Sequence, residues 1–197
     1  GLVLYLVERK KVIIVGIPGV GKTSLVTKVV ELIKAKNKTT SVHSYGTVML
    51  ELAKDFGVED RDELRTLPVE KQKELQRLAA EKLASLNDDV IFVDTHAFIS
   101  TKAGFYPGLP NHVIQIIEPT NFIAITASPD EIHNRRIKDE TRNRDTISIE
   151  EIKKELAVQD AMLSSCSVLS GSPMKVIFNH EGNIEEAANN VIETIGV

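Results

Sequence analysis

Short runs of β-branched and aromatic residues alternate along this chain with longer segments in which apolar residues recur at helical spacing. The runs are KVIIV, TSVHSY, VIFVD, NFIAIT and KVIFN, at residues 11–15, 40–45, 90–94, 121–126 and 175–179. Several of them are apolar at consecutive positions, which is typical of strands buried on both faces. Five such strands separated by helices predict a three-layer α/β fold with a parallel five-stranded sheet.

The helical segments show broad apolar faces and clear start signals. The segment after residue 22 carries its apolar face on Leu25, Val26, Val29, Val30, Leu32 and Ile33. Residues 69–87 carry a second stripe of leucine and alanine. SPDE at 128–131 and SIEE at 148–151 each predict a helix start, because the serine caps the first turn and the glutamate completes a capping box. Cys166 falls on the apolar side of the last helix, so we interpret it as a core residue rather than a nucleophile.

The length of 197 residues and a hydrophobic content of 42% predict a single domain, 1–197. Two segments, residues 45–70 and 135–147, break the regular alternation of predicted strands and helices. They are expected to be insertions. The first ten residues are apolar in part, but no basic residue precedes the apolar stretch and no small-residue cleavage site follows it. We interpret residues 1–10 as an N-terminal extension of uncertain structure.

Composition narrows the cellular setting and the partners. The apolar runs fall far short of the roughly 20 residues that cross a bilayer, so no membrane segment is expected. A single cysteine excludes an intramolecular disulfide, which favours the cytoplasm. A net charge of -4 argues against general binding of nucleic acid, so any anion site must be local.

The segment GIPGVGKT, residues 16–23, matches the phosphate-binding pattern G-x-x-x-x-G-K-[ST] between a predicted strand and a predicted helix. Glycines let successive N–H groups turn toward one centre, and the following helix adds the positive end of its dipole. Lys22 is expected to reach the β- and γ-phosphates of a nucleotide, and Thr23 to offer its hydroxyl to Mg²⁺. Asp94, at the end of the third predicted strand, is a candidate for holding the metal or its water shell. His96 is interpreted as a structural or supporting histidine.

Such a loop is compatible with switches, motors and small-molecule kinases. A guanine-nucleotide switch is expected to carry N-K-x-D and D-x-x-G, where this chain reads ITASPD and DTHA. Arginines occur instead in two clusters, Arg61 with Arg65 and Arg135 with Arg142 and Arg144. The first pair can hold a phosphate, and the second cluster, on a lid, would stabilise a transferring phosphoryl group while limiting hydrolysis. Solvated helix charges and a nucleic-acid patch are the alternatives, and interleaved acidic residues disfavour the patch.

Seven segments in the same order resemble the archaeal type of adenylate kinase. They are GIPGVGKT, YGTVM, DRDELR, DTHA, GFYPGLP, DETRNRD and MKVIFNHEG. The resemblance implies a P-loop NTPase fold with a helical AMP-binding insertion at about 45–70 and a short lid at about 135–147. It implies reversible phosphoryl transfer from MgATP to AMP, giving two ADP, and often a homotrimer.

By position, the resemblance also implies the site residues. The ATP site would comprise Gly16, Ile17, Pro18, Gly19, Val20, Gly21, Lys22, Thr23 and Ser24. The AMP site would comprise Tyr45, Gly46, Thr47, Met49, Arg65, Gly108, Leu109 and Pro110. Lys22, Arg135, Arg142 and Arg144 would be catalytic, with Thr23 and Asp94 at the Mg²⁺ and the NHEG turn near the ATP base. Tyr106 stands where the family usually has leucine, which bears on monophosphate selectivity. A kinase for another monophosphate or for shikimate, and a nucleotide-dependent switch, are the alternatives.

Overall fold

The computed structural model describes residues 8–139 and 147–197. Arg142 and Arg144, which the sequence assigns to the lid, therefore lie outside the described residues. The first seven residues of the expected N-terminal extension do so too.

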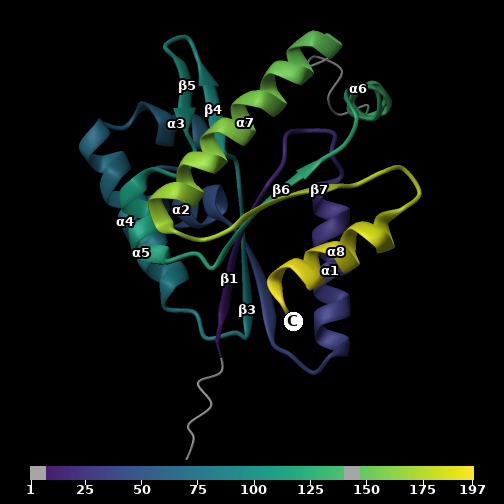
Figure 1. The fold of residues 1–197 in the computed structure, drawn as a ribbon. Coiled ribbons are helices and arrows are strands. Elements are labelled where there is room, and N and C mark those ends of the chain that lie inside the picture. The colour runs from purple at the N-terminus through teal and green to yellow at the C-terminus, as the bar shows by residue number, and fades with distance from the viewer. Residues whose placement is uncertain (1–7, 140–146) are drawn as a thin grey trace, which may run out of the picture.

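A parallel sheet of five strands forms the middle layer of the molecule (Figure 1). In spatial order the strands are β2 (Thr40–Ser44), β3 (Val90–Thr95), β1 (Lys10–Val15), β6 (Asn121–Thr126) and β7 (Met174–Phe178). All five predicted strands are confirmed. β1 lies at the centre, where Val12 is in register with Phe92 of β3 and Asn121 of β6. Strand β7 is one edge of the sheet, and β2 is the other.

Helices cover both faces of this sheet, which confirms the predicted three-layer fold (Figure 1). One face packs against α1 (Lys22–Ala35) and α8 (Ile184–Ile195). The opposite face packs against α2 (Tyr45–Lys54), α4 (Val69–Ala84), α5 (Asn111–Ile117) and α7 (Ile149–Ser170). Two shorter helices complete the set, α3 (Arg61–Thr66) and α6 (Pro129–Lys138).

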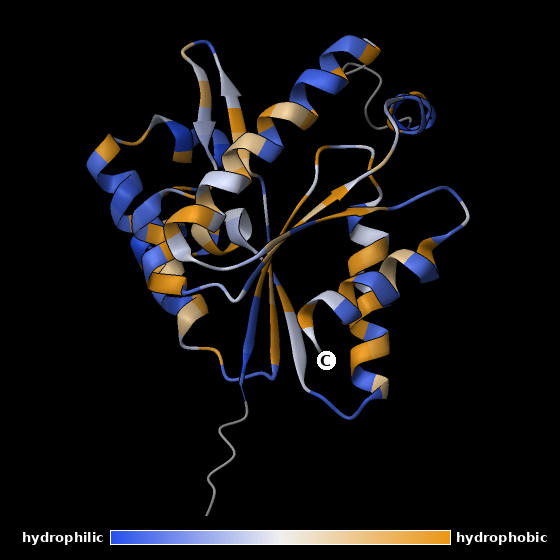
Figure 2. Cartoon of the chain, in the orientation of Figure 1, coloured by the Kyte–Doolittle hydropathy of each residue, from blue (hydrophilic) through white to orange (hydrophobic). Residues whose placement is uncertain are grey.

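The side chains of β1 divide between the two layers because successive residues of a strand point to opposite faces. Val12 and Ile14 belong to the cluster beneath α1 and α8, whereas Ile13 and Val15 belong to the cluster beneath α2, α4 and α5. All four are fully buried. The central strands are accordingly mostly hydrophobic, while the helices mix hydrophobic and hydrophilic residues (Figure 2).

The predicted helix starts are present. The Ser128 hydroxyl accepts from the Glu131 N–H, and the Glu131 carboxylate accepts from the Ser128 N–H, which completes the capping box of α6. At α7 the Ser148 hydroxyl accepts from the Glu151 N–H. Cys166 is buried on α7, as expected of a core residue.

A two-stranded hairpin was not predicted. Strands β4 (Phe98–Thr101) and β5 (Gly104–Pro107) pair antiparallel and project beyond the sheet (Figure 1). Their outward residues are exposed and each strand has only four residues, so no alternating pattern of buried positions marks them in the sequence. Among the described residues, no helix combines the length and the apolar character that spanning a membrane requires.

Candidate functional site

A cavity of about 600 Å³ lies beyond the carboxyl ends of β1, β2 and β3, the edge where open parallel sheets usually bind ligands. It is lined by the loop after β1, by α2, α3, α4 and α6, and by the β4–β5 hairpin. The sequence-predicted residues that line it are Gly16, Ile17, Pro18, Gly19, Gly21, Lys22, Thr23, Ser24, Tyr45, Gly46, Met49, Arg65, Asp94, Gly108 and Arg135. Most of the residues assigned to the two nucleotides are thus brought together in one cavity.

Of the assigned residues within 8–139 and 147–197, four do not line this cavity. Val20 and Leu109 are buried in the two hydrophobic clusters, with exposed fractions of 1% and 3%. Pro110 is the N-cap residue of α5, and the Thr47 hydroxyl accepts a hydrogen bond from Arg61. These residues can shape the turns beside the cavity, but they are not part of its lining.

The phosphate-binding loop is held by its carbonyl groups. Pro18 O accepts from Arg136 Nε at 2.7 Å, and Gly19 O accepts from Arg135 Nη1 at 3.2 Å. Val20 O accepts from Asn179 Nδ2 at 2.9 Å. In a trans peptide the carbonyl and the next N–H point in opposite directions. Anchoring three successive carbonyls therefore fixes the direction of the three N–H groups that follow them.

Two glycines of the loop are needed for this arrangement. Gly19 and Gly21 have φ values of +96° and +74°, a region that L side chains rarely adopt. A Cβ on Gly19 would lie 3.0 Å from Ile132 O, and one on Gly21 would lie 2.7 Å from Asn179 Nδ2. Side chains at these positions would push away the groups that hold the loop.

The side chains that hold the loop are themselves anchored. Arg136 is 5% exposed and also donates from Nη2 to Glu155 on α7 at 2.9 Å. Arg135 donates from Nη2 to Asn179 O at 2.9 Å and from Nε to Glu181 at 3.1 Å. The loop is thus tied to α6, to α7 and to the turn after β7. The sequence analysis missed Arg136, because the loop residue that it holds, Pro18, lies 118 residues away along the chain.

Lys22 begins α1 and points toward the end of β3. Its Nζ lies 2.5 Å from Asp94 Oδ1 and 3.1 Å from Thr95 O. Both Lys22 and Asp94 line the cavity, so a bound polyphosphate would compete with Asp94 for the ammonium group.

Oxygen ligands for a hard cation are present but few. Thr23 and Asp94 line the cavity together, whereas the described part of the chain holds no group of three or more His, Cys, Asp or Glu residues placed to bind a metal ion. Mg²⁺ commonly takes one or two protein ligands and completes its shell with phosphate and water oxygens. The residues present therefore fit a Mg²⁺ ion that arrives with a nucleotide.

The other end of the cavity is formed by α2, α3 and α4. Arg61 and Arg65 both line it, and neither is held by a strong ion pair to a residue that the structure describes. Arg61 Nη2 donates to Thr47 at 3.2 Å, while Arg65 lies 4.0 Å from Asp62 and its side chain is 70% exposed. Both guanidinium groups can therefore turn to an anion. Further lining residues that the sequence analysis did not assign are Ser44, Leu64, Gln72, Gln76, Thr95, His96, Ile99, Pro107 and Asp139.

Tyr45 joins α2 to α4 at this end. Its hydroxyl donates to Gln76 O at 2.9 Å, and burial raises the pKa of the phenol well above its ordinary value. The tyrosine is thus a neutral hydrogen-bond donor that fixes the spacing of the two helices.

The turn after β7 is fastened to the start of α6. Glu131 accepts from the Glu181 N–H at 2.8 Å and lies 3.3 Å from His180 Nδ1. The Glu181 N–H is the main reason that the pKa of Glu131 falls from 4.5 to about 2. The turn therefore holds Asn179 in a fixed position against the loop after β1.

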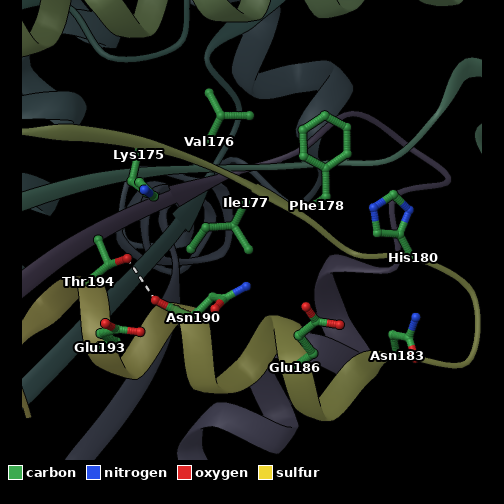
Figure 3. A pocket seen from close by; sticks show the side chains of 10 residues that line it. All are labelled: Lys175, Val176, Ile177, Phe178, His180, Asn183, Glu186, Asn190, Glu193 and Thr194. Atoms are coloured by element: carbon green, nitrogen blue, oxygen red, sulfur yellow. Dashed lines mark hydrogen bonds between the residues drawn. The ribbon is translucent and has the colours of Figure 1, made fainter.

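A second hollow, of about 510 Å³, lies at the sheet edge between β7 and α8 (Figure 3). The rings of Phe178 and His180 stack there with their centroids 5.4 Å apart. None of the residues of the loop after β1 lines this hollow.

Comparisons with known proteins concern the family and the fold of the whole chain. A family model described as an AAA domain matches residues 15–153. An adenylate kinase of Methanocaldococcus jannaschii is 40% identical over 190 residues, which cover 95% of this chain and 99% of that protein. An adenylate kinase of Methanopyrus kandleri is 41% identical over 188 residues, covering 93% and 96%. Among solved structures, a shikimate kinase from Bacteroides thetaiotaomicron matches with a TM-score of 0.59 and 11% identity, over 95% of this chain and 99% of that one. At that identity, the likeness is one of fold.

Proposed function

The chain belongs to the adenylate kinase family, and on this premise we propose that its cavity holds ATP at the end formed by the loop after β1 and AMP at the end formed by α2, α3 and α4. The reaction of the family moves the γ-phosphoryl group of ATP to an oxygen of the AMP phosphate, so that two ADP result. The observation that carries the proposal is the continuity of the cavity, which is lined by Lys22 and also by Arg61 and Arg65.

At the ATP end, the N–H groups of the loop and Lys22 bind the phosphates. Lys22 exchanges its contact with Asp94 for the phosphate oxygens, where it offsets negative charge as the γ-phosphoryl group moves. Asp94 and Thr23 would then be available to hold Mg²⁺, which would supply positive charge that offsets the charge of the phosphates. The NHEG turn, whose Asn179 holds the loop, lies beside the ATP base in this proposal.

At the AMP end, Arg61 and Arg65 bind the AMP phosphate and orient its attacking oxygen. Tyr45, Gly46 and Met49 border the same end. Arg135 approaches from α6, and Arg142 and Arg144, which lie outside the described residues, act from the lid. Arginines on two sides of the transferring group would spread charge stabilisation over its oxygens.

The direct test is phosphoryl transfer from MgATP with AMP, GMP, CMP, UMP or shikimate offered separately. We expect rapid ADP formation with AMP and a slow background rate without an acceptor. A slow rate that no acceptor changes would instead indicate a nucleotide-dependent switch, and rapid transfer to shikimate alone would reassign the acceptor end.

The variant Arg65→Ala tests the acceptor end. Removing a charge-assisted hydrogen bond to a phosphate should raise the KM for AMP by about tenfold or more and leave the KM for MgATP nearly unchanged. Arg77→Ala is the matched control, because Arg77 is on α4 and pairs with Glu81 at the surface. An unchanged KM for AMP in Arg65→Ala would move the acceptor phosphate elsewhere.

The homotrimer, which the family resemblance implies, and the cytoplasmic location, which the single cysteine favours, remain predictions. Light scattering coupled to size-exclusion chromatography tests the first. A mass close to three times 21.8 kDa is the expected result.

A further inference from the structure

Gln72 lies in the first turns of α4 and lines the AMP end of the cavity. Its Nε2 donates to Leu67 O at 2.8 Å and to Arg65 O at 3.1 Å. Both acceptors are backbone carbonyls of the segment that joins α3 to α4. The side chain is therefore fixed by a part of the backbone that also carries the phosphate-binding arginine.

These two contacts determine the orientation of the amide. A primary amide has two N–H donors on nitrogen and lone pairs only on oxygen. Only the amide nitrogen can donate to two carbonyl acceptors. In the flipped orientation, Gln72 Oε1 would face the two carbonyl oxygens and repel them. Gln72 Oε1 makes no hydrogen bond to any described residue, which leaves it as an acceptor in a cavity-lining side chain.

The acceptor nucleotide must lie with its phosphate toward Lys22 and the donor phosphates. Its base then points toward the far end, between α2 and α4. Met49 and Leu64 offer apolar side chains there for the faces of a ring, and two amides, Gln72 and Gln76, offer polar groups for its edge. The side-chain amide of Gln76 has no hydrogen bond within the described residues. It can present either N–H or C=O, and so it cannot discriminate between bases by polarity.

We propose that Gln72 Oε1 accepts a hydrogen bond from the exocyclic amino group of the acceptor base and thereby selects adenine over 6-oxo purines. This inference rests on the proposed function, because it takes the α2–α4 end as the AMP site. A 6-oxo group at the same place would put two acceptors face to face, and the fixed amide cannot turn to relieve the contact. A base without any group at this position would leave Oε1 unpaired.

The test compares AMP with purine riboside 5′-monophosphate, which lacks the amino group, and with inosine 5′-monophosphate, which has an oxo group in its place. For the unaltered protein we expect kcat/KM to fall about five- to tenfold for the first analogue and further for the second, as for loss of one neutral hydrogen bond and then for a mismatch. In Gln72→Met the ratio of AMP to purine riboside 5′-monophosphate should approach one. Gln115→Met, the same exchange at an exposed position on α5, should keep the original ratio.

The use of a ratio separates selectivity from structure. Loss of the two carbonyl contacts in Gln72→Met can loosen the segment between α3 and α4, but this lowers the rate with both substrates alike. An AMP preference that survives in Gln72→Met overturns the inference. Absence of phosphoryl transfer from MgATP to AMP in the unaltered protein would instead contradict the proposed function itself.

Discussion

Glu131 joins two segments that lie fifty residues apart in the chain. Its carboxylate caps the start of α6 at Ser128 and also accepts from the Glu181 N–H beyond β7. These two segments supply Arg135 and Asn179, which hold the phosphate-binding loop. One carboxylate therefore supports both sides of the loop without touching it.

The pH dependence of stability should report this carboxylate. The pKa of Glu131 is about 2 in the folded protein and 4.5 as the ordinary value, so the folded state binds fewer protons between these limits. The stabilisation is complete above pH 4.5 and declines as the pH falls toward 2. Between about pH 5 and pH 2.5, the unaltered protein should lose about 2 kcal/mol more free energy of unfolding than Glu131→Gln. Urea unfolding followed by circular dichroism measures this difference, and parallel pH profiles would contradict it.

The residues of the proposed phosphate site can be read from the sequence to the extent that their chemistry is local. Lys22 and Thr23 follow the glycines of GIPGVGKT. The N–H groups that converge on one centre and the start of α1 belong to the same stretch of backbone. Arg136 and Asn179 were not recognised as supports, because each contacts the loop across more than one hundred residues. Nothing near either residue in the sequence marks its partner.

At the scale of elements, α6 connects its own capping box to the loop after β1. The helix starts at Pro129, and nearly two turns later Arg135 and Arg136 reach successive carbonyls of the loop. The position of the phosphate-binding groups thus depends on where α6 begins. A helix that started one residue later would turn its arginines away from the loop.

We expect Arg136→Met to weaken ATP binding selectively. The change leaves Pro18 O and Glu155 without their buried partner, which should cost about 3 kcal/mol of stability and raise the KM for MgATP. The KM for AMP should change little. Arg136→Lys keeps the charge but not the two-pronged geometry, so it should recover only part of the loss. Equal effects on both KM values would indicate a general loss of structure instead.

The base of the β4–β5 hairpin is closed by a narrow contact at Gly108. The Gly108 N–H donates to Ala97 O at 3.0 Å, and a Cβ on Gly108 would lie only 1.8 Å from His96 O. We expect Gly108→Ala to lower the free energy of unfolding by about 2–4 kcal/mol, because the backbone must move to admit the methyl group. Thermal unfolding of Gly46→Ala is the comparison. A Cβ there meets only the end of Arg61 at 3.6 Å, so that variant should be at least as stable as the parent.

The five strands were readable from the sequence and the hairpin was not, for a physical reason. VIFVD and NFIAIT are buried on both faces of the sheet, which requires apolar residues at nearly every position. Their consecutive apolar residues therefore identify them as buried strands. In the hairpin, Ile99 and Tyr106 face each other across the strands and are both about half exposed. An exposed strand does not need apolar residues, so its sequence shows no apolar run by which it could be recognised.

At the scale of the molecule, the sheet separates two hydrophobic clusters while its carboxyl edge gathers the site. The strand order puts β1 between β3 and β6, so the loop that carries Lys22 emerges beside Asp94. The parallel arrangement was predictable from the alternation of strands and helices. The exact set of cavity residues was not, because residues such as Gln72 reach the cavity through packing between helices.

Cys166 offers a probe of the whole fold. Its thiol lies in the cluster beneath α2, α4 and α5, and burial raises its pKa above the ordinary value. A thiol reagent near neutral pH should therefore label the native protein at least about a hundredfold more slowly than the urea-unfolded chain. Absorbance of the released reagent group follows the reaction, and prompt labelling of the native protein would show that this face of the sheet opens readily.

The anchoring of the loop by Pro18 O, Gly19 O and Val20 O limits how far GIPGVGKT can act as an independent module. These eight residues specify a turn and a lysine. The three outward-pointing carbonyls, however, need hydrogen-bond donors that the eight residues do not supply. A designer who grafts the loop onto another sheet must also supply two arginines and an amide, or equivalent donors, behind it. Without them the carbonyl groups of the transplanted loop would bond to water, and its N–H groups would no longer be held pointing toward one centre.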